Sequence, residues 1–276
     1  MTLYLRLKVK ALLTNAELLG WGIGFIEFWV FMWLFVFTSG VEVKSPWYEY
    51  VVNTNAAMAY SFLGLLSMAS VAISLAYSIL YSSQATRYIT KFTRASPVIF
   101  MIEDFVASLL VMFVTVFVII ASVMAGAYVR WGLTPHVENP VGVFVDLMLG
   151  GIALYWLSYA LALVIIITKR VRATTMASFL PLILAFIVYA QLWVNFGDLV
   201  YVIPLSTMPS LLVYHSTGAI PPTGAYFKWL SGAGKLQAVD LRLAAISLCA
   251  WTILFAATSF VLLRKSRGIP VEEFRV

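Results

Sequence analysis

Long apolar runs separated by short polar segments dominate this chain. Six runs are each at least the roughly 20 residues that a helix needs to cross a bilayer. They cover residues 18–38, 56–81, 98–129, 143–168, 177–203 and 242–264. The fifth run contains Gly197 and Asp198, where it can break instead of crossing straight. The pattern predicts an all-α integral membrane protein with a six-helix transmembrane bundle.

The first 17 residues show a helical rather than a continuous apolar pattern. One predicted face carries Leu5, Val9, Leu12, Leu13 and Ala16, and other faces carry Arg6, Lys10 and Glu17. This pattern is typical of an amphipathic interfacial helix lying in the headgroup plane. A cleaved signal peptide is the alternative, but the apolar run that follows is too long and has no small-residue cleavage site.

The segment 204–240 has a different composition. Four prolines and four glycines interrupt apolar pieces that are too short to span a bilayer. Such pieces predict re-entrant or interfacial helices that cap the outer end of the bundle before the last span.

Basic residues interrupt the pattern between the second and third runs. Arg87, Lys91 and Arg94 are four and three residues apart, which places one basic stripe on a short helix. Ser96 and Pro97 then form a helix start, because serine caps helices and proline is favoured at the first helical position. We therefore expect a positively charged helical segment over residues 82–97 that lies outside the bilayer, on one aqueous side, and contacts a partner there.

The composition supports one membrane domain over residues 1–276. Hydrophobic residues make up 62% of the chain and charged residues 11%, too little polar surface for a soluble globule. The single Cys249 excludes an internal disulfide, and the two histidines, His136 and His215, are too far apart in sequence to suggest a metal site. The net charge of +6 does not by itself predict a nucleic-acid partner, because in a membrane protein the position of each basic residue matters more.

The basic residues divide unequally between the two sides of the predicted bundle. Five lie on one side: Lys44, Arg130, Lys228, Lys235 and Arg242. Thirteen lie on the other: Arg6, Lys8, Lys10, Arg87, Lys91, Arg94, Lys169, Arg170, Arg172, Arg264, Lys265, Arg267 and Arg275. The positive-inside rule predicts a multi-pass protein of the cell membrane whose two termini and basic segment are cytoplasmic.

One acid lies about halfway along the first run. Gly20, Gly24, Glu27 and Phe31 share a helical face, and the glycines are expected to let a neighbouring helix approach. A carboxylate facing lipid costs roughly 2.5–3.5 kcal/mol, so Glu27 is expected to face protein or a water-filled path. Glu27 and Phe31 are therefore candidates for a substrate path or gate, and a hydrogen-bonded packing role for Glu27 is the alternative.

Two runs carry stripes of small residues. The third has Ser108, Thr115, Ser122 and Gly126 on one face, and the second has Gly64, Ser67, Ser74 and Ser78. Such stripes are first of all helix contacts, and a polar translocation surface is the second interpretation. On the second interpretation, Ser108 and Thr115 also become path candidates.

No residue pattern predicts catalysis. The sequence SGAGKLQ fails as a phosphate loop, because Trp229 replaces the first required glycine and Leu236 replaces the Ser/Thr after the lysine. The chain also lacks a convincing nucleophile and base pair. We therefore expect no enzymatic activity, no cofactor and no metal in this chain, and a turn or cap role for Asp198.

This layout resembles the membrane-spanning permease subunit of type-2 ATP-binding-cassette exporters. The resemblance covers the amphipathic elbow, RYITKFTRASPVIFMIEDF at 87–105, the proline-broken segment before the last span, and WTILFAATSFVLLRKSRG at 251–268. It implies that 82–97 is a coupling helix contacting a separate ATPase subunit that binds ATP and Mg. The expected contacts on this chain are Arg87, Tyr88, Lys91, Phe92 and Arg94.

The resemblance also implies a second permease subunit, identical or different, that encloses the path. The chain departs from the family pattern at residues 169–175, a very short basic connection that leaves most coupling to 82–97. The alternative is an ion-coupled secondary transporter using Glu27 and Asp198, although no internal repeat supports it. A membrane-bound enzyme and a noncatalytic membrane anchor are weaker alternatives. The apolar spans suit hydrophobic or amphipathic cargo.

Overall fold

A computed structural model describes residues 3–38, 47–92, 96–170, 174–232 and 236–266. These residues are almost entirely helical, and they contain five helices long and apolar enough to cross a membrane. The five are Ala16–Phe37, Tyr48–Ser83, Pro97–Trp131, Pro140–Thr168 and Leu241–Lys265. The prediction of an all-α, multi-pass architecture is confirmed at this level.

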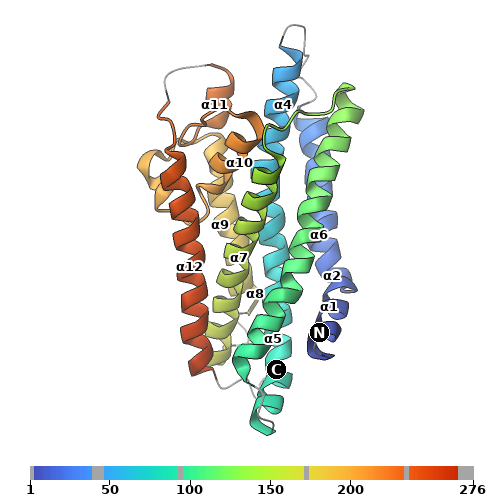
Figure 1. Cartoon of the computed structure of the whole chain (residues 1–276), viewed down its shortest axis with the longest axis vertical. Helices are drawn as coiled ribbons and strands as arrows, with labels where there is room; N and C mark the ends of the chain where they lie inside the picture. Colours follow the sequence, from blue (N-terminus) through green and yellow to red (C-terminus); the bar gives the residue numbers. More distant parts are fainter. Residues whose placement is uncertain (1–2, 39–46, 93–95, 171–173, 233–235, 267–276) are drawn as a thin grey trace.

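The chain runs up and down a single elongated bundle (Figure 1). We call the end that holds α1 (Leu3–Leu13) the lower end, and α12 (Leu241–Lys265) also finishes there. The first span consists of α2 (Ala16–Leu19), a π-helical segment Gly20–Gly24, α3 (Phe25–Phe31) and a second π-helical segment Met32–Phe37. The second consists of α4 (Tyr48–Met58), the π-helical Ala59–Leu63 and α5 (Gly64–Phe92).

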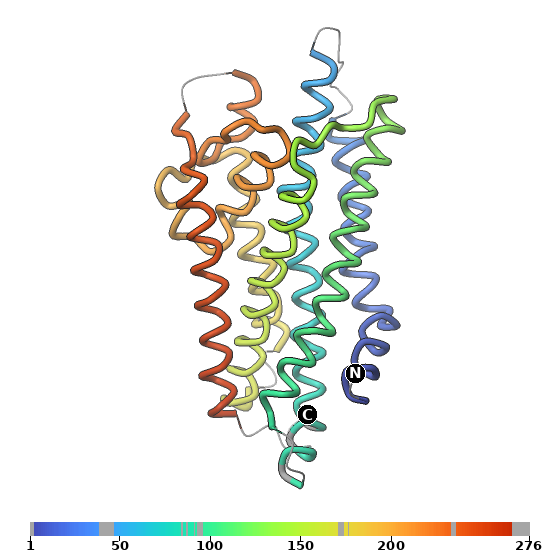
Figure 2. The backbone as a smooth tube through the Cα atoms, viewed as in Figure 1, coloured from blue at the N-terminus to red at the C-terminus, as the bar shows by residue number. Residues whose placement is uncertain are grey.

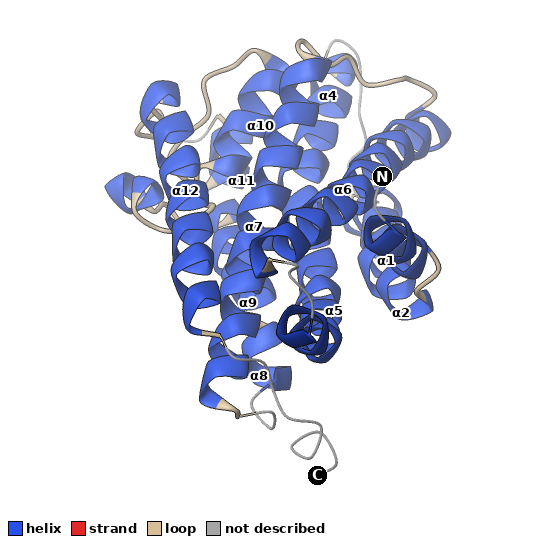
Figure 3. Cartoon of the chain, turned by 60° about the horizontal axis from the view of Figure 1, so that its bottom comes forward, coloured by secondary structure: helices blue, strands red, loops and turns tan. Residues whose placement is uncertain are grey.

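The helices α5 and α7 (Pro140–Thr168) form the core of the bundle. The most apolar stretch is 78% buried in the second span, which α5 completes, and 72% buried in α7, against 28% in the first span and 22% in α12. In the view of the lower end, α7 lies among α5, α10 and α12, and it contacts each of them (Figure 3). The first span and α12 therefore leave most of their apolar surface for lipid or for another chain.

The helix α6 (Pro97–Trp131) begins as the sequence predicts. Ser96 caps it, since the Ser96 Oγ accepts a hydrogen bond from the Val98 N–H, and Pro97 is the first helical residue. The preceding basic segment differs from the predicted short helix, because residues 82–92 simply continue α5. No helix breaker separates these residues from the span, so one rigid helix extends from the core of the bundle to its lowest point (Figure 2).

The fifth apolar run is shorter as a helix than the range 177–203 predicts. Helices α8 (Thr174–Ser178) and α9 (Leu180–Tyr189) and a 3₁₀ turn Ala190–Leu192 carry the chain toward the upper end. Residues beyond Leu192 form turns and a 3₁₀ helix, Gly197–Tyr201, because Gly197 has a φ of +53° and the Asn195 side chain accepts its N–H. A sixth membrane crossing through α8 and α9 stays a prediction.

The proline- and glycine-rich segment covers the upper end. It contains α10 (Met208–Thr217), packed against α7 and α4, and α11 (Tyr226–Leu230). Isolated bridges Asn195–Gly224 and Pro222–Ala238 tie it together. Gly224 has a φ of +149°, and a Cβ there would lie 2.4 Å from the Val194 carbonyl oxygen, so only glycine fits.

Candidate functional site

A groove of about 670 Å³ lies between the N-terminal helices, α5 and α8–α9; we call it the α5 groove. One wall is the α5 face formed by Ser70, Ser74, Tyr77, Ser78 and Tyr81, which recur at helical spacing. The facing walls are apolar and include Trp21, Phe25, Phe179 and Leu182. Lys8, Asn15 and Glu17 also line it. The groove therefore offers both hydroxyl and aromatic surface to a ligand.

The small-residue stripe of the second span divides between its two predicted roles. Gly64 and Ser67 serve packing: a Cβ on Gly64 would lie 2.5 Å from Leu147, and the Ser67 Oγ donates to the Gly22 carbonyl at 3.2 Å. Ser74 and Ser78 instead line the α5 groove. The helix-contact interpretation thus holds for the upper part of the stripe, and the lower part lines a cavity.

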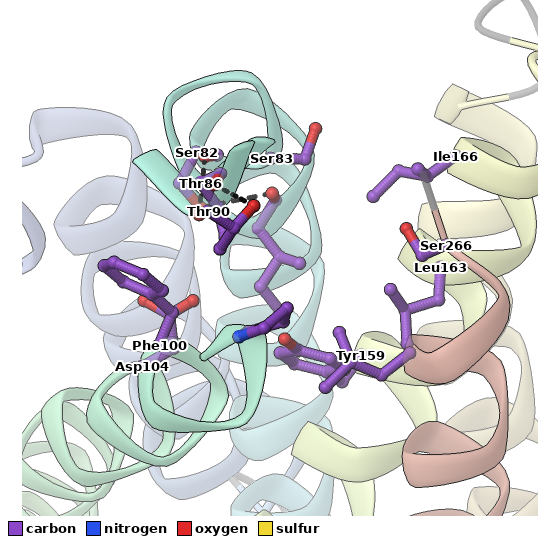
Figure 4. A pocket seen from close by; sticks show the side chains of 13 residues that line it. Ser82, Ser83, Thr86, Thr90, Phe100, Asp104, Tyr159, Leu163, Ile166 and Ser266 are labelled. Atoms are coloured by element: carbon purple, nitrogen blue, oxygen red, sulfur yellow. Dashed lines mark hydrogen bonds between the residues drawn. The ribbon is translucent and has the colours of Figure 1, made fainter. Parts of the chain in front are cut away.

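A second cavity, of about 300 Å³, lies near the lower end between α5, α6, α7 and α12; we call it the base cavity. Ser82, Ser83, Thr86 and Thr90 of α5 line one side of it, and Phe100 and Asp104 of α6 line another (Figure 4). Tyr159, Leu163 and Ile166 of α7 and Ser266 at the end of α12 complete its labelled lining. The base cavity therefore combines one carboxylate, several hydroxyls and apolar side chains.

A buried ionic cluster lies between the two cavities. The Lys8 Nζ is 3.1 Å from the Asp104 Oδ1, and the two side chains are only 8% and 6% exposed. Lys8 also donates to the Ser82 Oγ at 3.3 Å, and the Tyr4 hydroxyl donates to the Asp104 Oδ1 at 2.7 Å. Lys8 lines the α5 groove, Asp104 lines the base cavity, and Ser82 lines both. The cluster therefore joins α1, α5 and α6 at the boundary of two cavities.

The Tyr4 hydroxyl keeps its proton and donates a hydrogen bond in this cluster. Burial raises the pKa of Tyr4, and the adjacent Asp104 carboxylate raises it further. Tyr4 therefore stays protonated at physiological pH and keeps its proton directed at Asp104. The ring also packs edge-on against Phe100, with centroids 4.9 Å apart, so α1 is fixed to the start of α6 by polar and aromatic contacts.

The N-terminal helix is thus only partly what its pattern predicts. Leu5 and Val9 pack against the core and Leu12 is buried, as expected, but Leu13 is 40% exposed. Its most consequential side chain is Lys8, which the sequence pattern did not place on the buried face.

The four predicted path residues lie outside the two cavities described above. The Ser122 Oγ donates to the Glu27 Oε1 at 2.7 Å, which matches the packing alternative for Glu27, and Phe31 is 55% exposed. Ser108 and Thr115 are buried, and their hydroxyls donate to the backbone of their own helix at Asp104 and Val111. None of these four candidates lines the α5 groove or the base cavity.

The prediction for the glycines of the first span is wrong within this chain. Gly20 and Gly24 were expected to admit a neighbouring helix, but a Cβ at either position would meet nothing within 4 Å. The close approach occurs at Gly22, where a Cβ would lie 2.7 Å from Val71 Cγ2. The π-helical turns of this span shift its faces relative to a regular α-helix, so spacing rules based on 3.6 residues select the wrong glycines.

The lower tip of α5 presents aromatic rings to the surroundings. Tyr88 is 55% exposed and Phe92 is 73% exposed, and their rings stack with centroids 6.5 Å apart. The backbone at Arg87 and Lys91 belongs to the same helix, and Arg94 lies outside the described residues. Exposed stacked rings on a helix that projects from the bundle are typical of a contact surface.

A second, partly buried polar pair lies at the upper end. The His215 Nδ1 of α10 and the Asp146 Oδ2 of α7 are 2.6 Å apart, and the imidazole packs where a Cβ on Gly142 would lie 2.5 Å from it. Asp198, expected to act in a turn or cap, accepts a hydrogen bond from the Gln237 Nε2 at 2.9 Å and so ties the cap to the 3₁₀ helix.

Sequence reasoning missed the Lys8–Asp104 and His215–Asp146 pairs. A weak signal existed for the first, because Tyr4, Lys8 and Leu12 share a helical face and Asp104 lies inside an apolar run. Nothing in the spacing linked residues about 100 positions apart.

The described residues contain no group of three or more His, Cys, Asp or Glu side chains that could hold a metal ion. Comparison with protein-family models and with curated proteins finds no match to the chain.

Proposed function

We propose that this chain is the permease subunit of a type-2 ATP-binding-cassette exporter, worked by a separate ATPase subunit that binds ATP and Mg. The ATPase is expected to contact the lower tip of α5 through Arg87, Tyr88, Lys91, Phe92 and Arg94. The proposal places this chain in the cell membrane as a noncatalytic, multi-pass subunit.

One observation carries the proposal: the helix that forms a wall of the α5 groove is also the helix that projects from the bundle. Ser70, Ser74 and Ser78 line the groove, and α5 continues without a break to Phe92. A force on the tip is therefore transmitted to the groove wall by a rigid element. A partner that binds the tip differently in its ATP-bound and ATP-free states can then change the shape of the groove.

The distribution of charge supports cytoplasmic placement of that tip. Helix ends carrying Lys10, Arg264 and Lys265 lie at the lower end, and those carrying Arg130 and Arg242 lie at the upper end (Figure 1). The larger basic group of the sequence thus gathers where α5 projects, and the positive-inside rule favours a cytosolic lower end. A second permease subunit, identical or different, is expected to close the open side of the α5 groove.

The experiment is co-purification of the chain with an ATPase subunit, sought among the reading frames that neighbour its gene. The triple variant Arg87→Glu/Lys91→Glu/Arg94→Glu is expected to lose at least about 90% of the bound ATPase, because a tenfold loss needs only about 1.4 kcal/mol at the interface. The matched control is Arg6→Glu/Lys10→Glu, which reverses basic residues on the neighbouring α1 and should retain the ATPase.

Normal co-purification of the triple variant, or equal loss in the control, would contradict the coupling role of the tip. The competing carrier hypothesis predicts that purified chain alone moves cargo on an ion gradient. Such transport without ATP would favour the carrier over the exporter.

A further inference from the structure

The α5 hydroxyls that line the base cavity donate their protons to carbonyls of their own helix. The Ser82 Oγ donates to the Ile79 carbonyl at 3.1 Å, the Ser83 Oγ to the Leu80 carbonyl at 2.6 Å, and the Thr86 Oγ1 to the Ser82 carbonyl at 3.0 Å. A hydroxyl that donates to its own helix still offers lone pairs. This wall therefore presents hydrogen-bond acceptors to a ligand (Figure 4).

The Asp104 carboxylate adds a charged acceptor to the same cavity. Both of its described side-chain partners, the Tyr4 hydroxyl and the Lys8 ammonium, bind one oxygen, Oδ1. The other oxygen, Oδ2, receives no hydrogen bond from the residues that the structure describes. A ligand with several N–H donors and a positive charge matches Asp104 and the α5 wall, whereas an anion would be repelled by the carboxylate.

The rest of the lining is mostly apolar, apart from Tyr159 and Ser266. Phe100, Leu163, Ile166 and Leu263 surround the polar wall, so the same cavity can cover an aliphatic or aromatic body. The acceptors and the apolar side chains together specify an amphiphile with a cationic head.

We propose that the base cavity binds amphiphilic primary amines, whose ammonium takes the place of the Lys8 ammonium on Asp104. Leaving a buried carboxylate without a counter-charge is costly, but exchanging one ammonium for another keeps it paired. The exchange frees Lys8 from α6, and Lys8 already lines the α5 groove. The assignment of such amines as cargo rests on the proposed function, whereas their binding does not.

The test is equilibrium binding of radiolabelled dodecylamine to the purified full-length chain in phosphatidylcholine nanodiscs at pH 7. Dodecyltrimethylammonium, which has the charge but no N–H, and dodecanol, which has neither charge nor N–H, serve as matched competitors. Dodecylamine is expected to bind, and a tenfold molar excess of either competitor to displace little of it.

Four variants test the site. Lys8→Met removes the competing ammonium and should tighten dodecylamine binding about tenfold, while Asp104→Asn should weaken it about tenfold or more. Lys10→Met removes the same charge from the exposed side of α1 and should leave the affinity unchanged. The double variant Lys8→Met/Asp104→Asn leaves no buried charge unpaired, so it keeps the test valid if Asp104→Asn alone does not fold, and it should bind as weakly.

Displacement by dodecanol as effective as by unlabelled dodecylamine, or equal affinities in Lys8→Met and Lys10→Met, would overturn the site. Because no ATPase is present in the assay, this failure is separate from that of the exporter proposal. Intact amine binding together with normal ATPase co-purification of the Arg87→Glu/Lys91→Glu/Arg94→Glu variant would overturn only the coupling proposal. Loss of ATPase from that variant without amine binding at the base cavity would overturn only this inference.

Discussion

The two ends of the bundle close differently. At the upper end, α10 and α11 cover the helices, two isolated bridges hold the cap, and Asp146 pairs with His215 behind a glycine. At the lower end, the buried Lys8–Asp104 pair lies between two cavities, and α5 projects past its neighbours. Backbone bridges and tight glycine contacts favour one arrangement, whereas a side-chain ion pair beside open volume can be exchanged.

This difference indicates where motion is available. A packed cap resists small displacements, because every shift loses contacts that nothing replaces. At the lower end, the polar contacts between α1 and α6 come from Tyr4 and Lys8 to Asp104, beside cavities that a ligand or water can enter. We therefore expect the cap to act as the fixed part and the lower end as the responsive part.

The largest expected effect is at the lower pair. Lys8→Met leaves Asp104 buried without its counter-charge and should lower the free energy of unfolding by about 3 kcal/mol. Adding Asp104→Asn to that variant should recover most of the loss, because no buried charge then remains unpaired. Unfolding titrations of both variants in mixed micelles measure this, and equal stability of the single and double variants would contradict an ionic role.

A somewhat smaller effect is expected at the cap. Gly224→Ala forces a Cβ against the Val194 carbonyl at a φ of +149° and should destabilise the chain by about 2 kcal/mol. The control is Gly20→Ala in a helical segment where a Cβ meets nothing, which should be neutral or slightly stabilising. Thermal unfolding of the two variants gives the comparison, and a tolerated Gly224→Ala would show that the cap is less tightly packed than described.

The smallest expected effect is at Glu27, away from both ends. Glu27→Gln keeps an oxygen to accept the Ser122 hydrogen bond, so stability should change by less than about 0.5 kcal/mol and cargo transport should be unchanged. Transport by the variant, reconstituted with the ATPase, is the measurement. A severe loss of transport would instead support a role for Glu27 in the substrate path and favour the ion-coupled alternative.

The comparison also shows which features are local in origin. The apolar runs, the Ser96 cap with Pro97 and the proline- and glycine-broken cap segment were readable from consecutive residues, because span length and capping depend on neighbours in sequence. The fifth run breaks close to the expected Gly197 and Asp198, but its helix already ends at Leu192, because Asn195 and Gly197 turn the backbone while apolar residues continue in the sequence.

The site itself depended on packing. Ser67 contacts the first span, whereas Ser74 lines a cavity. The difference depends on how far each residue lies from the first span, and the spacing of small residues in the sequence does not contain that distance. Likewise, Glu27 could be recognised as protein-facing but not as the acceptor for Ser122.

By itself, the sequence determined that this protein is a bundle of apolar helices with a basic helical segment between the second and third spans. Only the tertiary structure decided that Lys8 meets Asp104, that Gly22 rather than Gly20 or Gly24 admits Val71, and that α5 joins a cavity wall to the tip of the bundle. The physical reason is that hydrophobic length is a property of one helix, whereas a buried partner depends on the rotation and depth of two.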